Sequence, residues 1–300
     1  MKKYIIVITG SPRGGQASWE SLINNVKKPL LADLALCYGD QFELPSILKE
    51  NLDYDWKFKE PKNWRAYFEE NFSGTWEEFF LLGSDRGMAG GIDKNTGSGA
   101  IVSGLKDIVL RNHLQTLEKY EYIIHTRFDQ MYTDTHPSFE GDNIWIPEGE
   151  DYFGVCDRHA IFPSKYARQY FGVCNFIDDK NVYKDPPSIV NPESVFYNNL
   201  IYNKLENKVK RIPRFQFTAS SNDDTTRWRK AIYRVYFRRN LLIKYPDEFI
   251  ISIKNYIDLN GLPKVLNNNF IFYMNYKYIN LRRFLGLVKG KLIKPTQNNL

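Results

Sequence analysis

The sequence predicts an α/β protein with a parallel sheet and helices on its faces. The chain opens with an apolar strand, a turn, a helix and a second strand, which is the order of a βαβ unit. A later apolar run, Tyr120–Thr126, ends on Arg127-Phe128-Asp129, as strands do at the ligand-binding edge of such sheets. The region past Thr225 is basic, aromatic and mostly helical in pattern, so we expect a C-terminal extension.

The first elements follow from apolar runs and turn residues. Lys2–Thr9 is expected to be a buried strand, ended by the turn Gly10-Ser11-Pro12-Arg13-Gly14-Gly15. Ser18 is the expected N-cap of a short amphipathic helix over residues 19–27. Residues 30–36 form the second predicted strand, which ends in a turn at 38–40.

The middle of the chain continues the alternation of helices and strands. Residues 41–82 have a polar, helical pattern, and a glycine-dense stretch then leads to a helix from Ser98 to Leu117. After Tyr120–Thr126 the pattern predicts, in order, a strand at 143–147, a polar loop at 148–152, a helix at 165–170, a charged loop at 178–187, a helix at 192–203 and a strand at 214–217.

Composition excludes several classes of protein. Of the 300 residues, 43% are hydrophobic and 25% charged, which is ordinary for a globular protein and excludes a disordered or collagen-like chain. The apolar runs are too short to span a bilayer. Three cysteines without CxxC spacing favour reduced thiols over a disulfide or zinc scaffold. Because the apolar run at 5–8 is too short for an export signal, we expect a cytoplasmic protein, peripheral to a membrane at most.

Charge is divided unevenly along the chain. Residues 227–300 carry 15 Lys/Arg and 3 Asp/Glu, whereas residues 1–226 carry 26 and 32. A basic tail on an acidic body indicates an anionic partner, such as phospholipid, nucleic acid or a phosphate-bearing substrate; a solvated basic helical surface is the alternative. The charge change predicts a boundary near residue 226 between a domain over 1–226 and a helical extension over 227–300.

Asp129 is the sharpest candidate for chemistry. It follows a predicted buried strand, and open α/β sheets bind ligands in the crevice beyond their carboxyl ends. A carboxylate there can hold Mg²⁺ or Mn²⁺, which would bridge two phosphate oxygens. Arg127 could stabilise a diphosphate directly. The alternative is a local ion pair between Arg127 and Asp129.

Two glycine-containing segments are candidate anion-binding loops. The turn with Gly10, Ser11 and Arg13 matches neither a Walker loop nor GxGxxG, but it could approach a nucleotide closely. Gly97 and Ser98 open a predicted helix, where backbone amides can meet an anion or a sugar. A plain structural turn is the alternative for both.

Acidic residues gather after the predicted strand at 143–147. The group comprises Glu148, Glu150, Asp151 and Asp157, with Arg158 and His159 adjacent. Carboxylates bind sugar hydroxyls, and one facing an acceptor hydroxyl can act as a general base. Glu193, at a predicted helix start, is a further candidate, or simply a favourable helix-dipole contact. Absence of a Ser–His–Asp order or HExxH spacing gives a hydrolase little support.

Several of these segments, in this order, resemble a family of small glycosyltransferases found in large DNA viruses and bacterial surface-polysaccharide gene clusters. The similar segments are residues 10–13, 97–101, 123–129, 144–152, 157–159 and Asp224-Thr225-Thr226-Arg227-Trp228. The resemblance implies a GT-A-like nucleotide-binding sheet, a nucleotide-sugar donor and a divalent cation, Mn²⁺ or Mg²⁺. Arg127-Phe128-Asp129 stands where such enzymes usually carry Asp-x-Asp, so Asp129 alone carries over as the metal ligand.

The expected function is transfer of a sugar from a nucleotide-sugar donor to a glycan, or to a lipid- or protein-linked glycan acceptor. The expected donor side is Gly10, Ser11, Arg13, Gly97, Ser98, Arg127 and Asp129; the catalytic carboxylates are Asp157, Glu150 and Asp151; and the acceptor side is Glu148, Arg158 and His159.

Two other functions stay open at this point. A nucleic-acid-binding module could use Tyr233 and the basic aromatic run Tyr236-Phe237-Arg238-Arg239, although an acidic body would repel phosphate. An inactive carbohydrate-binding homologue is the other. The alternation of apolar and basic residues in the tail also predicts attachment to an anionic membrane surface.

Overall fold

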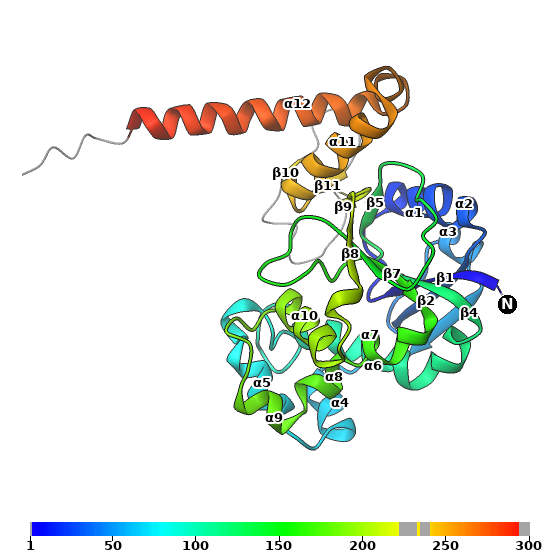
Figure 1. The fold of residues 1–300 in the computed structure, drawn as a ribbon, viewed down its shortest axis with the longest axis vertical. Coiled ribbons are helices and arrows are strands. Elements are labelled where there is room, and N and C mark those ends of the chain that lie inside the picture. Colours follow the sequence, from blue (N-terminus) through cyan, green and yellow to red (C-terminus); the bar gives the residue numbers. More distant parts are fainter. Residues whose placement is uncertain (1, 222–232, 235–240, 294–300) are drawn as a thin grey trace, which may run out of the picture.

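A seven-stranded, mainly parallel sheet forms the centre of the protein (Figure 1). The structure is a computed structural model that describes residues 2–221, 233–234 and 241–293. The strand order is β3-β2-β1-β4-β7-β6-β8, in which only β7 runs antiparallel to its neighbours. The strands are β1 (Lys2–Thr9), β2 (Asp33–Gly39), β3 (Tyr54–Phe58), β4 (Tyr120–Thr126), β6 (Ile144–Pro147), β7 (Ala160–Pro163) and β8 (Val209–Ile212).

Apolar residues on both faces of β1 explain why the sheet lies between helices. Ile5 and Val7 pack in one core cluster, with residues of α6 (Gly99–Leu117). Ile6 and Ile8 point to the other face, towards α1 (Gln16–Leu22). A strand buried on both faces is typical of parallel sheets. Since β1 and β4 are parallel neighbours, the segments that follow them meet at one edge of the sheet.

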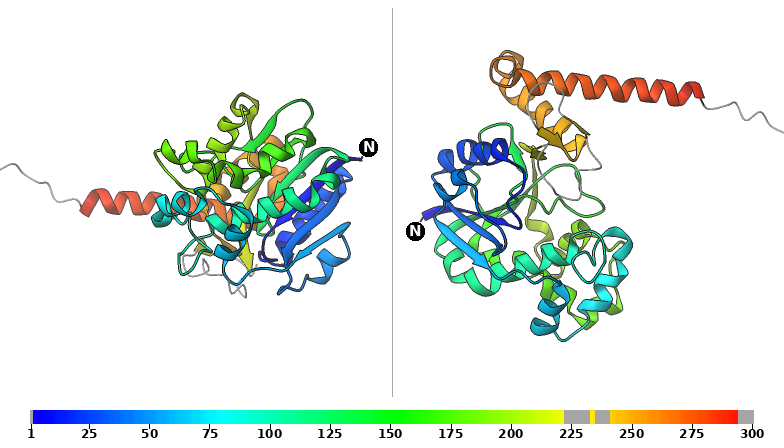
Figure 2. Two further views of the ribbon diagram at one scale, coloured as in Figure 1. Left: turned by 90° about the horizontal axis from the view of Figure 1, so that it is seen from below. Right: turned by 180° about the vertical axis from the view of Figure 1, so that it is seen from behind.

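A second, antiparallel sheet carries the C-terminal helices. Its strand order is β10-β11-β9-β5, with bounds β5 (Gln130–Tyr132), β9 (Gln216–Ser221), β10 (Tyr233–Arg234) and β11 (Leu241–Ile243). Phe217 of this sheet packs against Phe249 of α11 (Pro246–Asn260) and Phe272 of α12 (Leu262–Ile293). The far end of α12 extends beyond the body of the protein (Figures 1 and 2).

Shorter helices complete the described chain. The α-helices are α2 (Lys28–Leu30), α3 (Ser46–Lys49), α4 (Trp64–Asn71), α5 (Trp76–Leu82), α7 (Ala167–Phe171), α8 (Val173–Ile177), α9 (Lys180–Lys184) and α10 (Pro192–Tyr202). A π-helical turn, η1 (Ile23–Lys27), follows α1, and 3₁₀ turns lie at η2 (Ser84–Arg86), η3 (Ser164–Tyr166) and η4 (Glu206–Lys208). No helix in the described ranges combines the length and apolar character needed to cross a bilayer.

The structure corrects three expectations about local elements. Gly15, not Ser18, caps the first helix, and Ser18 lies buried inside it. The region expected to be helical over 41–82 contains β3, an edge strand whose exposed Asp55 and Lys57 flank the buried Trp56. The charged stretch expected to be a loop at 178–187 contains α9, whose first turn is capped by the Asp179 carboxylate.

The predicted fold class is confirmed: the protein is α/β, with a mainly parallel sheet flanked by helices and a helical C-terminal region. The predicted boundary at 226 lies outside the described residues, as do 224–228 and 236–239. Hydrogen-bonded strands lie on both sides of that boundary, because β9 pairs with β11.

Candidate active site at the carboxyl edge of the sheet

Two arginines hold the carboxylate of Asp129 just beyond β4. Arg127 donates from Nε to Oδ1 at 3.0 Å and from Nη2 to Oδ2 at 2.7 Å. Arg13, from the turn after β1, places Nε 3.1 Å from Oδ2. Burial opposes ionisation of Asp129, but the two guanidinium charges outweigh it and lower the pKa to about 2. The predicted strand-end ion pair between Arg127 and Asp129 therefore exists, and Arg13 from the turn after β1 joins it.

Gly14 lets the turn after β1 approach this carboxylate. Its φ is +108°, and a Cβ there would lie 2.6 Å from the Phe128 carbonyl oxygen and 2.8 Å from Asp129 Cα. Any other residue would clash with that backbone, so glycine is needed for the contact between the two strand ends.

Lys244 adds a third cation to the cluster. It follows β11 directly, and its amide donates to the Thr218 carbonyl at 3.0 Å. Burial and the neighbouring Arg127 and Arg13 charges lower the pKa of Lys244 to about 7, although Asp129 opposes the shift. With three basic groups around one carboxylate, the cluster has an excess of positive charge and suits an anion.

A cavity of about 150 Å³ brings together six of the predicted site residues. It lies between the turn after β1, the start of α6 and the end of β4. The six residues are Gly10, Ser11, Arg13, Ser98, Arg127 and Asp157. Phe42 and Glu60 also line it; the sequence analysis missed both, although each follows a strand, β2 or β3, at the same edge of the sheet.

Asp129 and its neighbours do not fit a divalent cation. Both carboxylate oxygens are already engaged by guanidinium groups. Mg²⁺ and Mn²⁺ prefer several hard oxygen ligands, and the described residues contain no group of three or more His, Cys, Asp or Glu that could hold a metal. A cation bound here would also lie beside the guanidinium charges of Arg13 and Arg127. The Asp129 carboxylate therefore serves the two arginines rather than a metal ion.

Asp157, which lines the cavity, is paired with a second carboxylate, Glu193. Arg158 Nη1 lies 2.7 Å from Glu193 Oε1 and 3.9 Å from Asp157 Oδ1, so both acids share one nitrogen. Burial and the adjacent Asp157 charge raise the pKa of Glu193 to about 7, although Arg158 opposes the shift. A buried carboxylate whose pKa is raised towards neutrality, beside a second carboxylate, is typical of acid–base sites.

Glu193 also lines a second hollow, of about 380 Å³, which two aromatic side chains border. Phe153 is 78% exposed and Tyr152 is 43% exposed. Glu150, Tyr152 and Phe153 all have positive φ, a conformation that costs energy and clusters at functional sites. Asn191 holds the loop in place by donating to the Tyr152 carbonyl at 2.7 Å. Aromatic faces beside polar groups suit the faces of a sugar ring.

Other predicted site residues line neither hollow. Arg158 is buried, and its Nε donates to Glu248 Oε1 at 3.0 Å, which Arg214 Nη1 also contacts at 3.1 Å. His159 is buried with its ring 3.1 Å from His136 Nε2 and 3.3 Å from the Tyr132 hydroxyl. Burial lowers the pKa of His159 well below its usual range, so it is neutral.

The remaining predicted residues have identifiable surroundings. Glu148 lies 3.3 Å from Asn255 Nδ2, and Asp151 accepts from Arg211 Nη2 at 2.7 Å. The Oε2 atom of Glu150 is buried and has no hydrogen-bond partner among the described residues. Gly97 packs on the backbone of Gly87, which leaves no room for a Cβ.

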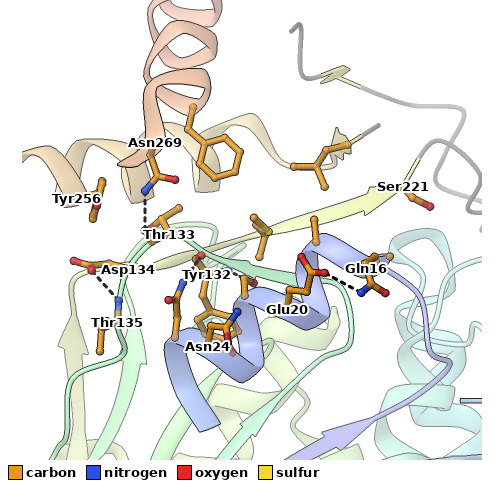
Figure 3. A pocket seen from close by; sticks show the side chains of 18 of the residues that line it. Gln16, Glu20, Asn24, Tyr132, Thr133, Asp134, Thr135, Ser221, Tyr256 and Asn269 are labelled. Carbon is orange, nitrogen blue, oxygen red and sulfur yellow. Dashed lines mark hydrogen bonds between the residues drawn. The ribbon is translucent and has the colours of Figure 1, made fainter. Parts of the chain in front are cut away.

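A larger cavity of about 720 Å³ begins at Gly14 and Gly15, directly after Arg13. Gln16 and Glu20 of α1 and Asn24 of η1 line one side, and residues 132–135 with Tyr256 and Asn269 line the other (Figure 3). Several of these polar groups bond to each other, as Gln16 Nε2 does to Glu20 Oε1 at 2.8 Å. No predicted site residue lines this cavity.

Comparison with known proteins does not show the function of this chain. No family model and no curated protein matches the chain. Among solved structures, the PaToxG glycosyltransferase is similar over 68% of this chain and 68% of its own, with 11% sequence identity and a TM-score of 0.35. A likeness at that level carries no functional argument.

Proposed function

We propose that the protein is a nucleotide-sugar-dependent glycosyltransferase. The observation that carries the proposal is the cavity lined both by Asp157 and by Arg13 and Arg127, the two arginines that pair with Asp129. A group-transfer reaction with a diphosphate leaving group needs both: positive charge for the leaving group and a base for the incoming hydroxyl.

The cationic cluster would bind the diphosphate. Arg13 and Arg127 present guanidinium groups, which match phosphate geometry, and Lys244 supplies a further cation. Asp129 contacts both guanidinium groups and keeps the two arginines in position. In this account protein cations, rather than a metal at Asp129, stabilise the charge that develops on the leaving diphosphate.

The nucleoside would extend towards Phe42 and Glu60. Phe42 offers an aromatic ring on which a base can pack, and the Glu60 carboxylate can accept hydrogen bonds from ribose hydroxyls. Gly39 makes room for Glu60, because a Cβ there would overlap its carboxylate. At about 150 Å³, the cavity accommodates only part of such a donor, so we assign it to the diphosphate, with the nucleoside at its Phe42 and Glu60 edge.

The acceptor would enter from the hollow beside Tyr152 and Phe153. Asp157 takes the proton of the acceptor hydroxyl as its oxygen bonds to the anomeric carbon. The bond from that carbon to the diphosphate oxygen breaks, and the electron pair leaves with the nucleoside diphosphate. Glu193 adjoins Asp157, and both carboxylates contact Arg158 Nη1, which holds them in position. The expected acceptor is a glycan or a lipid- or protein-linked glycan.

Release of nucleoside diphosphate tests the proposal. Purified protein is incubated with UDP-, GDP- and dTDP-sugars, with and without glycan acceptors. We expect one donor to be turned over, and Asp157→Asn to lower kcat by about 10²–10⁴-fold, the usual contribution of a general base, with donor affinity unchanged. Asp55→Asn, at an exposed position of β3, is the matched control.

Two results would contradict the proposal. If Asp157→Asn weakens donor binding as much as turnover, the residue serves the donor or the fold. If a nucleotide sugar binds without any turnover across the acceptor panel, the protein is a carbohydrate-binding homologue instead.

A further inference from the structure

We propose that helix α12 docks the protein on an anionic membrane surface, through an apolar face directed away from the body. The proposal is independent of the proposed catalytic function. It rests on the two faces of this helix, its placement and its charge.

The two faces of α12 are both apolar. Phe272 and Ile279 are buried against the second sheet and α11. On the opposite face, exposed apolar side chains recur at intervals of three or four residues, which places them in one stripe along a helix. The stripe consists of Phe270, Met274, Tyr278, Leu281 and Leu285, with Phe284 beside it; their exposures run from 38% to 62%.

The stripe is placed where a flat surface can reach it. The opposite face of α12 packs on the second sheet and α11, and the far end of α12 stands clear of the body (Figures 1 and 2). Arg283 Nη1 donates to Asp247 of α11 at 2.6 Å, and Phe272 anchors the first half. The helix is therefore held with its stripe outward.

The charge of α12 indicates which partner would cover the exposed stripe. Residues 262–293 carry six Lys/Arg and no Asp/Glu. Lys277 lies within the stripe, with Nζ 5.4 Å from the Tyr273 ring centre, and Arg282 borders it. A second copy packed on this face would bring like charges together, whereas an anionic bilayer would neutralise them. An apolar face with basic flanks is typical of helices that lie in a bilayer interface.

The test measures binding of the full-length protein to vesicles by sedimentation. Vesicles of phosphatidylcholine alone are compared with vesicles containing about 30% phosphatidylglycerol, a fraction chosen to give an anionic surface. We expect binding only to the anionic vesicles, and loss of that binding at high salt, because surface charges are screened.

Paired variants separate the apolar and electrostatic contributions. Leu281→Asn with Leu285→Asn removes exposed apolar area without disturbing the buried face. Lys277→Gln with Arg282→Gln removes two charges. We expect each pair to weaken binding about tenfold or more. Leu31→Asn, at a position 89% exposed on the body, and Lys49→Gln with Lys59→Gln are the controls and should bind like the parent protein.

Any of four results would overturn the proposal. The first two are no binding to either kind of vesicle and equal binding to both kinds. The third is a loss of binding in the body controls as large as in the α12 variants. The fourth is a protein that does not bind vesicles but forms a dimer in ultracentrifugation, which Leu281→Asn with Leu285→Asn dissociates.

Discussion

Asp129 stabilises the folded protein as well as the site, because its buried carboxylate is ion-paired with Arg13 and Arg127. Its pKa falls from 3.8 to about 2 on folding, which corresponds to about 2 kcal/mol at neutral pH. A lowered pKa gives stability that is present above pH 4 and is lost as the pH falls through 2.

Asp129→Asn is therefore expected to lower the free energy of unfolding by about 2 kcal/mol at pH 7. Near pH 2 the variant and the parent protein should differ little in stability, because the parent carboxylate is then largely protonated. Denaturant titration at both pH values measures this. The exposed Asp55→Asn should change little. An Asp129→Asn protein as stable as the parent at pH 7 would show that the ion pairs contribute nothing.

Lys244 gives donor binding a dependence on pH. Its pKa of about 7 must rise when a diphosphate approaches, because negative charge favours the protonated amine. Affinity should therefore be constant below pH 7 and fall above it, by up to about tenfold per pH unit. Titration calorimetry with a nucleotide sugar from pH 6 to 8.5 measures the slope.

A Lys244→Gln protein is the comparison for that slope. It should bind more weakly than the parent protein at pH 6 and show no slope between pH 7 and 8.5. A parent protein whose affinity is flat over this range would mean that Lys244 does not contact the donor.

At the scale of elements, α11 ties the C-terminal region to the candidate site. Glu248 of α11 is buried and accepts from both Arg158 and Arg214, while its Oε2 accepts from the Thr218 amide at 2.6 Å. Arg158 in turn contacts both Glu193 and Asp157. The C-terminal helices thus support the carboxylate pair, although they lie far along the chain from it.

Glu248→Gln should destabilise the protein by about 3–5 kcal/mol, the usual cost of leaving buried charges without their partner. Its neighbour Asp247 is 56% exposed and pairs with Arg283, so Asp247→Asn should cost less than about 1 kcal/mol. Thermal and denaturant unfolding compare the two. Equal, small losses would show that the buried network does not anchor α11.

Local patterns predict some elements well and others poorly, for physical reasons. Lys2–Thr9 and Tyr120–Thr126 are recognisable because apolar residues cover both faces of a parallel strand. The sequence does not predict β3 because it is an edge strand. Its exposed Asp55 and Lys57 flank Trp56, so the segment has the polar character expected of a surface helix. The N-cap is missed because Gly15 caps through backbone conformation, without a side-chain hydrogen bond.

At the scale of the whole molecule, the sequence predicts which segments meet but not which atoms pair. Strand-end reasoning places Asp129 and the Gly10–Gly15 turn at one edge, where the structure has them. Arg13 and Asp129 are more than a hundred residues apart in the sequence, so no local pattern predicts that they pair. Lys244 and Glu193 likewise reach the site through the second sheet and α10, whose positions no local pattern reveals.

The most direct test of the central claim is calorimetric titration with UDP, GDP and dTDP in the presence of EDTA. We predict that one nucleoside diphosphate binds without a divalent cation, that added Mn²⁺ changes its Kd by less than about threefold, and that Arg13→Gln weakens it about tenfold or more, as loss of a charge-assisted hydrogen bond requires. Absence of binding in EDTA, or binding that appears only with Mn²⁺, would contradict the account.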